Sequence, residues 1–189
     1  MSNLGHRLGE GNTTKTENTI ERMKRNLNYQ VCEKFKYWEF DINETKDGSL
    51  VVYHDRNFKK YGDKRRLRDM TLAEIKHEYP FVPSLKELLI AMKEETISKP
   101  IRIEIKRLVS SKGRDAILRL AEEFRRSVHS DVQFIAFRSH FKKSFPKDMR
   151  DYWAFEFRVR EFKVLNVKNK KQDLFNNDDS LINRFLNWI

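Results

Sequence analysis

The chain has 189 residues, of which 39% are hydrophobic and 35% are charged. This length and apolar content exclude a disordered chain and predict a single globular domain over residues 1–189. Lys and Arg outnumber Asp and Glu by 39 to 28, and the formal charge of +11 favours an anionic partner: a phosphate-bearing substrate, an anionic membrane surface or nucleic acid.

Two absences in the sequence indicate the compartment. Cys32 is the only cysteine, which excludes an internal disulfide and favours a reducing environment. No run of about 18 apolar residues predicts a membrane span, and the first residues lack the apolar stretch of a signal peptide. We therefore expect a cytoplasmic protein, or a mature form whose leader is missing.

The first third of the chain predicts a strand, a loop, a helix and a strand. A short strand at 2–7 precedes a polar loop at 8–16. The segment 17–35 is predicted to be an amphipathic helix, because apolar residues recur in it at helical spacing: Ile20, Met23, Leu27 and Val31. A strand follows at 37–42. A turn at Asp47-Gly48 then leads to an apolar run over 50–53 that ends at His54.

The middle of the chain predicts a basic loop at 56–68, and then helices and strands in alternation. Two helices have capping pairs, in which a hydroxyl residue is followed three positions later by Glu. The pairs are Thr71 with Glu74 in the helix at 70–79, and Ser84 with Glu87 in the helix at 82–95. A strand at 101–106, a helix at 112–128 and a strand at 131–137 follow.

The last quarter predicts fewer elements. They are a helix at 139–149, strands at 152–159 and 162–167, and a closing helix at 179–189. Strands that alternate with helices indicate parallel βαβ units. The apolar end at Trp188 and Ile189 predicts docking into the core or into a second copy of the chain.

Two predicted strands carry charged residues on one side and apolar residues on the other. Glu39 and Asp41 share a side of 37–42, about 7 Å apart, and Glu104 and Lys106 share a side of 101–106. An antiparallel sheet with one solvated face gives the same alternation. Because helices intervene, we instead favour a barrel, in which such side chains point inward and those near the strand ends reach the mouth.

Three carboxylates from these strands, Glu39, Asp41 and Glu104, form a candidate metal site. An all-oxygen set is preferred by hard divalent cations, Mg²⁺ or Ca²⁺. His6 and His54 stand at the ends of predicted strands and could transfer protons at the entering and leaving oxygens of a displacement. Arg7 and Lys106 could hold a phosphate.

Residues 4 to 106 resemble the glycerophosphodiester phosphodiesterases. The resemblance is carried, in the family's order, by "GHR", "ENT", "WEFDINETKDGSLVVYHD", "MTLAEIKHEYPFVPSLKELL" and "IRIEIK". It implies a (β/α)₈ TIM-type barrel, although the chain is shorter than the roughly 250 residues typical of one. The C-terminal half is thus short of strands in this prediction.

The resemblance also implies roles for individual residues. Glu39, Asp41 and Glu104 match the cation ligands, His6 and His54 the catalytic pair, and Arg7 and Lys106 the phosphate contacts. Glu17 and Asn18 match a supporting E-N pair. Two positions depart from the family pattern: Leu8 stands where Gly is usual, which could narrow the phosphate pocket, and Thr16 stands where Pro is usual.

The implied reaction is hydrolysis of a small glycerophosphodiester to glycerol 3-phosphate and an alcohol, with one divalent cation. A lipid phosphodiesterase similar to sphingomyelinase D is an alternative, and the basic loop 56–68 could approach either a soluble head group or an anionic membrane surface. A second alternative is a barrel that binds phosphates or nucleic acid without turnover. Nucleic acid is not the partner we expect.

Overall fold

The computed structural model describes residues 3–9, 16–126, 132–137, 140, 143–145 and 162–165. The elements that shape the site are the helices α1 (Ile20–Asn26), α2 (Leu72–Glu78), α3 (Leu85–Glu94) and α4 (Ser111–Arg126) and the strands β1 (Trp38–Glu44), β2 (Leu50–Val52), β3 (Ile101–Arg107), β4 (Val132–Phe137) and β5 (Phe162–Leu165). Four short 3₁₀ turns accompany them: His6–Leu8, Leu27–Val31, Lys59–Tyr61 and Leu67–Asp69.

The described strands form one five-stranded sheet in the order β2-β1-β3-β4-β5. Strands β1, β3, β4 and β5 are parallel neighbours, as the alternation of strands and helices predicts. Strand β2 differs, because it runs antiparallel to β1. The turn between them is too short for a parallel crossover, and Gly48 adopts the left-handed φ of 78° in it.

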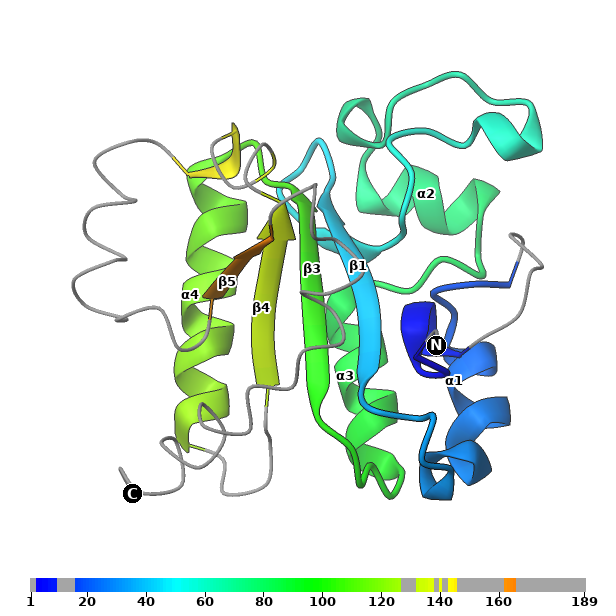
Figure 1. Ribbon diagram of the computed structural model, residues 1–189. Helices are drawn as coiled ribbons and strands as arrows, with labels where there is room; N and C mark the ends of the chain where they lie inside the picture. The colour runs from blue at the N-terminus through cyan, green and yellow to red at the C-terminus, as the bar shows by residue number, and fades with distance from the viewer. Residues whose placement is uncertain are drawn as a thin grey trace.

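The two faces of the β1–β3 pair have different neighbours. Helices α3 and α4 cover one face (Figure 1), and the apolar residues of the strands pack there with Leu88, Met92 and Ile117 of those helices. The residues facing them are Trp38, Phe40 and Ile42 of β1, and Ile101, Ile103 and Ile105 of β3. The acidic residues between them therefore point to the opposite face.

The N-terminal segment is not a strand, contrary to the prediction for 2–7. Residues His6–Leu8 form a 3₁₀ turn in which Arg7 and Leu8 have left-handed φ values of 51° and 65°. Close packing explains the difference: a Cβ on Gly5 would lie 2.0 Å from the carbonyl oxygen of Tyr37. The side chain of Leu8 is fully buried in the core, and the narrowing of the phosphate pocket by Leu8 stays a prediction.

The predicted helix at 17–35 is also shorter than expected. Helix α1 ends at Asn26, and the 3₁₀ turn Leu27–Val31 rotates the following side chains because it has three residues per turn. Gln30 turns inward and accepts hydrogen bonds from the Trp38 indole and the Ser98 amide, both at 2.9 Å. Val31, which the helical spacing placed on the apolar side, is 91% exposed.

The two predicted capping pairs are confirmed. The Thr71 hydroxyl accepts from the amide of Glu74, whose carboxylate accepts from the Thr71 amide, and α2 begins there. Ser84 and Glu87 make the same reciprocal bonds at the start of α3. Helix α4 and strands β3 and β4 lie within two residues of their predicted bounds.

The basic loop 56–68 is folded onto a second apolar cluster. This cluster joins the loop to β2 and α2 and consists of Val51, Tyr53, Phe58, Leu67, Met70, Ile75, Tyr79 and Val82. The rings of Phe58 and Tyr79 stack with their centroids 3.8 Å apart. The loop is thus held in place by its own core beside the sheet.

Several C-terminal predictions fall outside the described residues. The strand at 152–159 and the helix at 179–189 lie there entirely, with Trp188 and Ile189, and the helix at 139–149 is described only at 140 and 143–145. The described strands form an open sheet, so they do not test closure into eight strands. Among the described helices, none combines the length and apolar character needed to cross a bilayer.

Candidate active site

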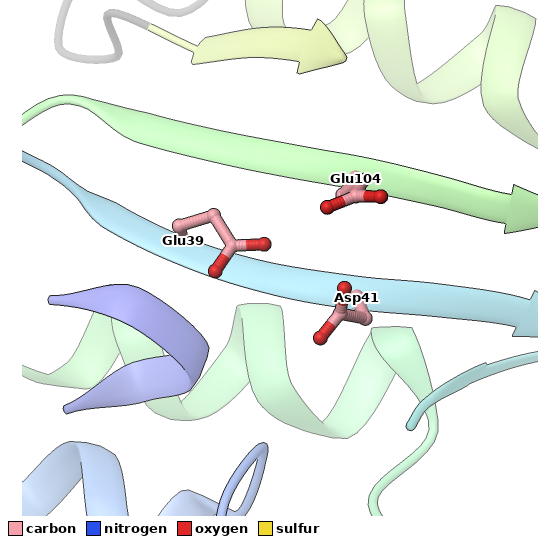
Figure 2. Close-up of side chains that lie close together, drawn as sticks. All are labelled: Glu39, Asp41 and Glu104. Atoms are coloured by element: carbon pink, nitrogen blue, oxygen red, sulfur yellow. The ribbon is translucent and has the colours of Figure 1, made fainter. Parts of the chain in front are cut away.

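Three acidic side chains meet on the face of the sheet opposite α3 and α4. Figure 2 shows Glu39 and Asp41 extending from β1 and Glu104 from the adjacent β3, all on one side. Asp41 and Glu104 are direct register partners in the parallel ladder. One carboxylate oxygen from each of the three residues lies within 4.8 Å of the others, and each residue is at most 4% exposed.

The pKa values of Glu39 and Asp41 shift in opposite directions. The pKa of Glu39 is raised well above its ordinary value by burial and by the neighbouring charges of Asp41 and Glu104. Burial also disfavours ionised Asp41, but Lys106, His54 and Arg7 outweigh it and lower the pKa of Asp41 to about 2. The cluster thus holds Asp41 ionised and favours a proton on Glu39.

Two basic side chains contact the cluster directly. The ammonium of Lys106 lies 2.9 Å from Asp41 Oδ1 and 2.6 Å from Glu104 Oε1. The guanidinium Nε of Arg7 lies 3.6 Å from Asp41 Oδ2, and the Arg7 backbone N–H donates to Glu39 Oε2 at 2.9 Å. Burial opposes the charge of Lys106, yet Asp41 and Glu104 raise its pKa, so it stays protonated.

The E-N pair supports the cluster from the first loop. The side chain of Asn18 donates to Asp41 Oδ2 at 2.9 Å and accepts from the Asp41 amide at 3.2 Å, which fixes Asp41 at two points. Glu17 accepts from Arg7 at 2.7 Å. The left-handed φ of 60° at Asn18 is one that Asn adopts more readily than most residues.

The two predicted catalytic histidines lie near the carboxylates, His6 by Glu39 and His54 close enough to Asp41 to affect its pKa. His6 Nε2 is 3.7 Å from Glu39 Oε2. Tyr53, next to His54, donates its amide to the carbonyl of Asp41 at 2.9 Å, so the antiparallel return of β2 brings His54 level with Asp41. We had expected a barrel strand to deliver His54 to the mouth; the strand that precedes His54 is β2, which forms a hairpin with β1.

Two supporting contacts were missed in the sequence. Asp55 Oδ1 lies 2.7 Å from His54 Nδ1, so Asp55 orients the imidazole ring through that nitrogen. The adjacency "HD" was visible, but adjacent residues need not touch. Lys60 contacts Glu17 Oε1 at 3.3 Å, across 43 positions of sequence, and no local signal predicts that pairing.

The donor set fits a divalent cation. Carboxylate oxygens are the ligands that hard cations prefer, and three of these groups are buried close together. Glu39 Oε1 is buried and has no hydrogen-bond partner among the described residues, which leaves an acceptor available for an ion. A cation would also relieve the repulsion that raises the pKa of Glu39.

The sequence profile of the glycerophosphoryl diester phosphodiesterase family matches residues 6–181. The chain belongs to this family. Glycerophosphoryl diester phosphodiesterases have a TIM-barrel-like fold and generally depend on a divalent metal, in keeping with the parallel strands and the buried carboxylates. No curated protein matches the chain significantly.

Solved structures of family members are similar to the chain. A glycerophosphodiester phosphodiesterase from Thermotoga maritima has 28% identity and a TM-score of 0.54, over 76% of this chain and 57% of that one. A putative one from Galdieria sulphuraria has 22% identity and a TM-score of 0.55, over 82% and 71%. One from Parabacteroides distasonis has 16% identity and a TM-score of 0.57, over 87% and 63%. The chain thus spans little more than half of the Thermotoga protein.

Proposed function

We propose that this chain hydrolyses small glycerophosphodiesters to glycerol 3-phosphate and an alcohol. The observation that supports this most is the buried cluster of Glu39, Asp41 and Glu104, flanked by two imidazoles in a chain that matches the family profile. In this proposal the three carboxylates hold one divalent cation, Mg²⁺ or Ca²⁺. When bound, the cation would stabilise negative charge on the non-bridging phosphate oxygens.

Arg7 and Lys106 are proposed to bind the substrate phosphate. Both remain cationic beside the carboxylates, because the acidic neighbours raise the pKa of each against the opposing effect of burial. Arg7 presents a planar fork of donors and Lys106 a compact charge. A phosphate held between them would have charge-assisted hydrogen bonds on its non-bridging oxygens, which strengthen as charge develops in the transition state.

The two histidines are proposed to move the protons. His6 takes the proton of the substrate's own glycerol hydroxyl as that oxygen attacks phosphorus, and His54 protonates the departing alkoxide. The product of this step is a cyclic phosphate. Water then opens it with the two roles reversed. The contact of His54 Nδ1 with Asp55 supports a proton-transfer role for the other ring nitrogen of His54.

The proposal also covers the complete fold, the cellular location and the partners of the protein. We expect the remaining segments to complete a (β/α)₈ barrel and the protein to be cytoplasmic. Contact with an anionic membrane surface and self-association through the C-terminus remain predictions of the same kind. Nucleic acid is not an expected partner, and a salt titration of DNA binding tests this, because phosphate-driven binding weakens steeply as salt rises.

The decisive assay measures release of glycerol 3-phosphate with and without chelator. We expect metal-dependent release from glycerophosphocholine or glycerophosphoethanolamine. His54→Ala should abolish turnover while the protein still binds metal, measured by calorimetry. A preference for lysolipid micelles that ends at a cyclic product would indicate the activity similar to sphingomyelinase D. Full turnover in chelator, or in His54→Ala, would contradict the proposed mechanism.

A further inference from the structure

A cavity lined mostly by polar residues adjoins the carboxylate cluster. It has a volume of about 300 Å³, which is at the lower end of small-ligand sites. Four of its lining residues are arginines, and we call it the arginine pocket after them: Arg56, Arg66, Arg68 and Arg107. Such a concentration of guanidinium groups around one concave space favours an anionic ligand, above all a phosphate.

The arginines have few acidic partners. Arg68 lies 3.7 Å from Asp69, whereas Arg56, Arg66 and Arg107 form no ion pair within the part of the chain that the structure describes. Glu44 is the one acidic residue among the lining residues. Its carboxylate accepts hydrogen bonds from the amides of Val109 and Ser110 ahead of α4, so it is already bonded elsewhere.

The pocket is built on ordered backbone. Arg56 and Arg66 lie at the neck of the basic loop, which is closed by an antiparallel bridge between Asn57 and Arg66 and by a 2.8 Å bond from the Leu67 amide to the Arg56 carbonyl. Arg107 is paired with Asn43 at the end of the β1–β3 ladder. The loop and the sheet therefore hold their arginines around the same space.

The pocket also adjoins the candidate active site. Arg56 follows His54 by two residues, Asn43 follows Asp41 by two and Arg107 follows Lys106 by one. Two residues along a strand correspond to about 7 Å. Burial lowers the pKa of the His140 imidazole to about 4, and the charges of Lys106, Arg56, Lys143 and Arg107 add to this effect. Lys106, Arg56 and Arg107 thus all lie close enough to His140 to act on the same side chain.

We infer that the arginine pocket binds a second phosphate group, a phosphomonoester carried by the alcohol part of the substrate. The inference rests on the proposed function, in which His54 protonates the departing alcohol, because Arg56 places the pocket on that side of the site. The preferred substrates are then glycerophosphodiesters of a phosphorylated alcohol. A concave space of this volume fits such a group better than a flat membrane surface.

A matched pair of ligands tests the inference. Glycerophosphoinositol and glycerophosphoinositol 4-phosphate differ by one phosphomonoester. Their affinities for the full chain are measured by calorimetry after metal removal by dialysis, so that turnover does not interfere. We expect the phosphorylated ligand to bind at least about tenfold more tightly, the effect of one charge-assisted contact. The double variant Arg56→Gln/Arg66→Gln should lose this difference.

The control variant makes the same change of charge elsewhere. Arg25→Gln/Arg119→Gln alters two exposed arginines of α1 and α4 and should keep the preference. Equal affinity for both ligands in the wild type would overturn the inference, as would a preference that survives in Arg56→Gln/Arg66→Gln. Loss of binding to phosphatidylglycerol vesicles in that variant, without a ligand preference in the wild type, would also overturn it.

The metal-loaded preparations separate this inference from the proposed function. If wild type and both double variants hydrolyse unphosphorylated glycerophosphoinositol equally, the proposed function holds whatever the calorimetry shows. If none of them hydrolyses either ligand, the proposed function fails, and the calorimetric preference still decides whether the pocket recognises the second phosphate.

Discussion

The two faces of the β1–β3 pair are equally buried but contribute differently to the stability of the fold. Phe40 and Ile103 are fully buried against α3 and α4, while Glu39 and Glu104, their neighbours on the same strands, are 1% and 4% exposed on the other face. The first face removes apolar surface from water and stabilises the fold. The second concentrates negative charge in a region that water hardly reaches, which opposes folding. Equal burial therefore does not mean an equal contribution to stability.

The charged face persists because its members compensate one another. Lys106 lies between Asp41 and Glu104, and Arg7 and Asn18 contact Asp41. Glu39 is less well matched, since one of its oxygens has no hydrogen-bond partner in the described structure and burial raises its pKa. Glu39 thus keeps an acceptor for a further cation. The same unmatched group lowers the stability of the metal-free protein.

The largest expected effect is at Glu39, where a substitution should lower turnover without lowering stability. Glu39→Gln removes a proposed ligand charge, so we expect metal-dependent turnover to fall by about 10³-fold. The metal-free protein should be as stable as the wild type or more so, because repulsion with Asp41 and Glu104 is relieved. Steady-state kinetics and thermal unfolding without metal check both parts. Glu94→Gln, an exposed change on α3, should alter neither.

The opposite result is expected on the apolar face. Ile103→Ala leaves a cavity against the helices and should lower the free energy of unfolding by about 3 kcal/mol, with Ile103→Val costing about 1 kcal/mol. Turnover per folded molecule should stay close to that of the wild type. Denaturant unfolding and active-site-normalised kinetics measure the two quantities. A large loss of turnover in Ile103→Ala with unchanged stability would contradict a purely stabilising role of the apolar face.

A smaller effect is expected at the edge of the charged face. Lys60 contacts Glu17, which in turn holds Arg7, so Lys60 is a positioning residue in this arrangement. Lys60→Met should lower kcat/KM about fivefold, in line with the modest energy of a partly exposed ion pair. Lys60→Arg should restore most of it, and Lys59→Met, at the exposed neighbour, should have no effect. Equal losses in Lys59→Met and Lys60→Met would indicate only a general effect of loop charge.

The smallest effect concerns an exposed carboxylate whose pKa shifts in the opposite direction to that of Glu39. The amide and hydroxyl of Thr71 hydrogen-bond Glu74 and lower its pKa below the ordinary 4.5. The folded-state pKa is depressed, so this stabilisation is present above pH 4.5 and is lost as the pH falls through the folded value. Thermal unfolding should show Glu74→Gln less stable than wild type at neutral pH, with the difference shrinking in acid. In a Thr71→Ala background the pH dependence should become smaller but persist, because the backbone amide of residue 71 still donates to Glu74.

Local patterns predicted which side chains share a face of the sheet, but not how the chain folds between the strands. The alternation in 37–42 and 101–106 assigned Glu39, Asp41 and Glu104 to one side, and the capping pairs located α2 and α3. The same kind of pattern was wrong at Val31, because a 3₁₀ turn changes the period after Asn26. Periodicity describes a segment only for as long as its helix type is constant.

The positions of His54 and of the arginine pocket were beyond reach of any local pattern. His54 lies near Asp41 because β2 returns antiparallel to β1. Arg56, Arg66 and Arg107 line one cavity because a loop bridge and the end of the sheet meet there. These juxtapositions depend on contacts between residues far apart in the chain.

By itself the sequence determined which side chains share a face, where two helices begin and which family motifs are present, since each follows from neighbours a few residues apart. The tertiary structure alone decided the distances: the packing of three carboxylates within 4.8 Å, the insertion of Lys106 between two of them and the turn that aims the Arg7 amide at Glu39. Electrostatic effects such as the raised pKa of Glu39 depend on those distances and on the exclusion of water. A sequence pattern contains neither the distances between these groups nor the exclusion of water around them.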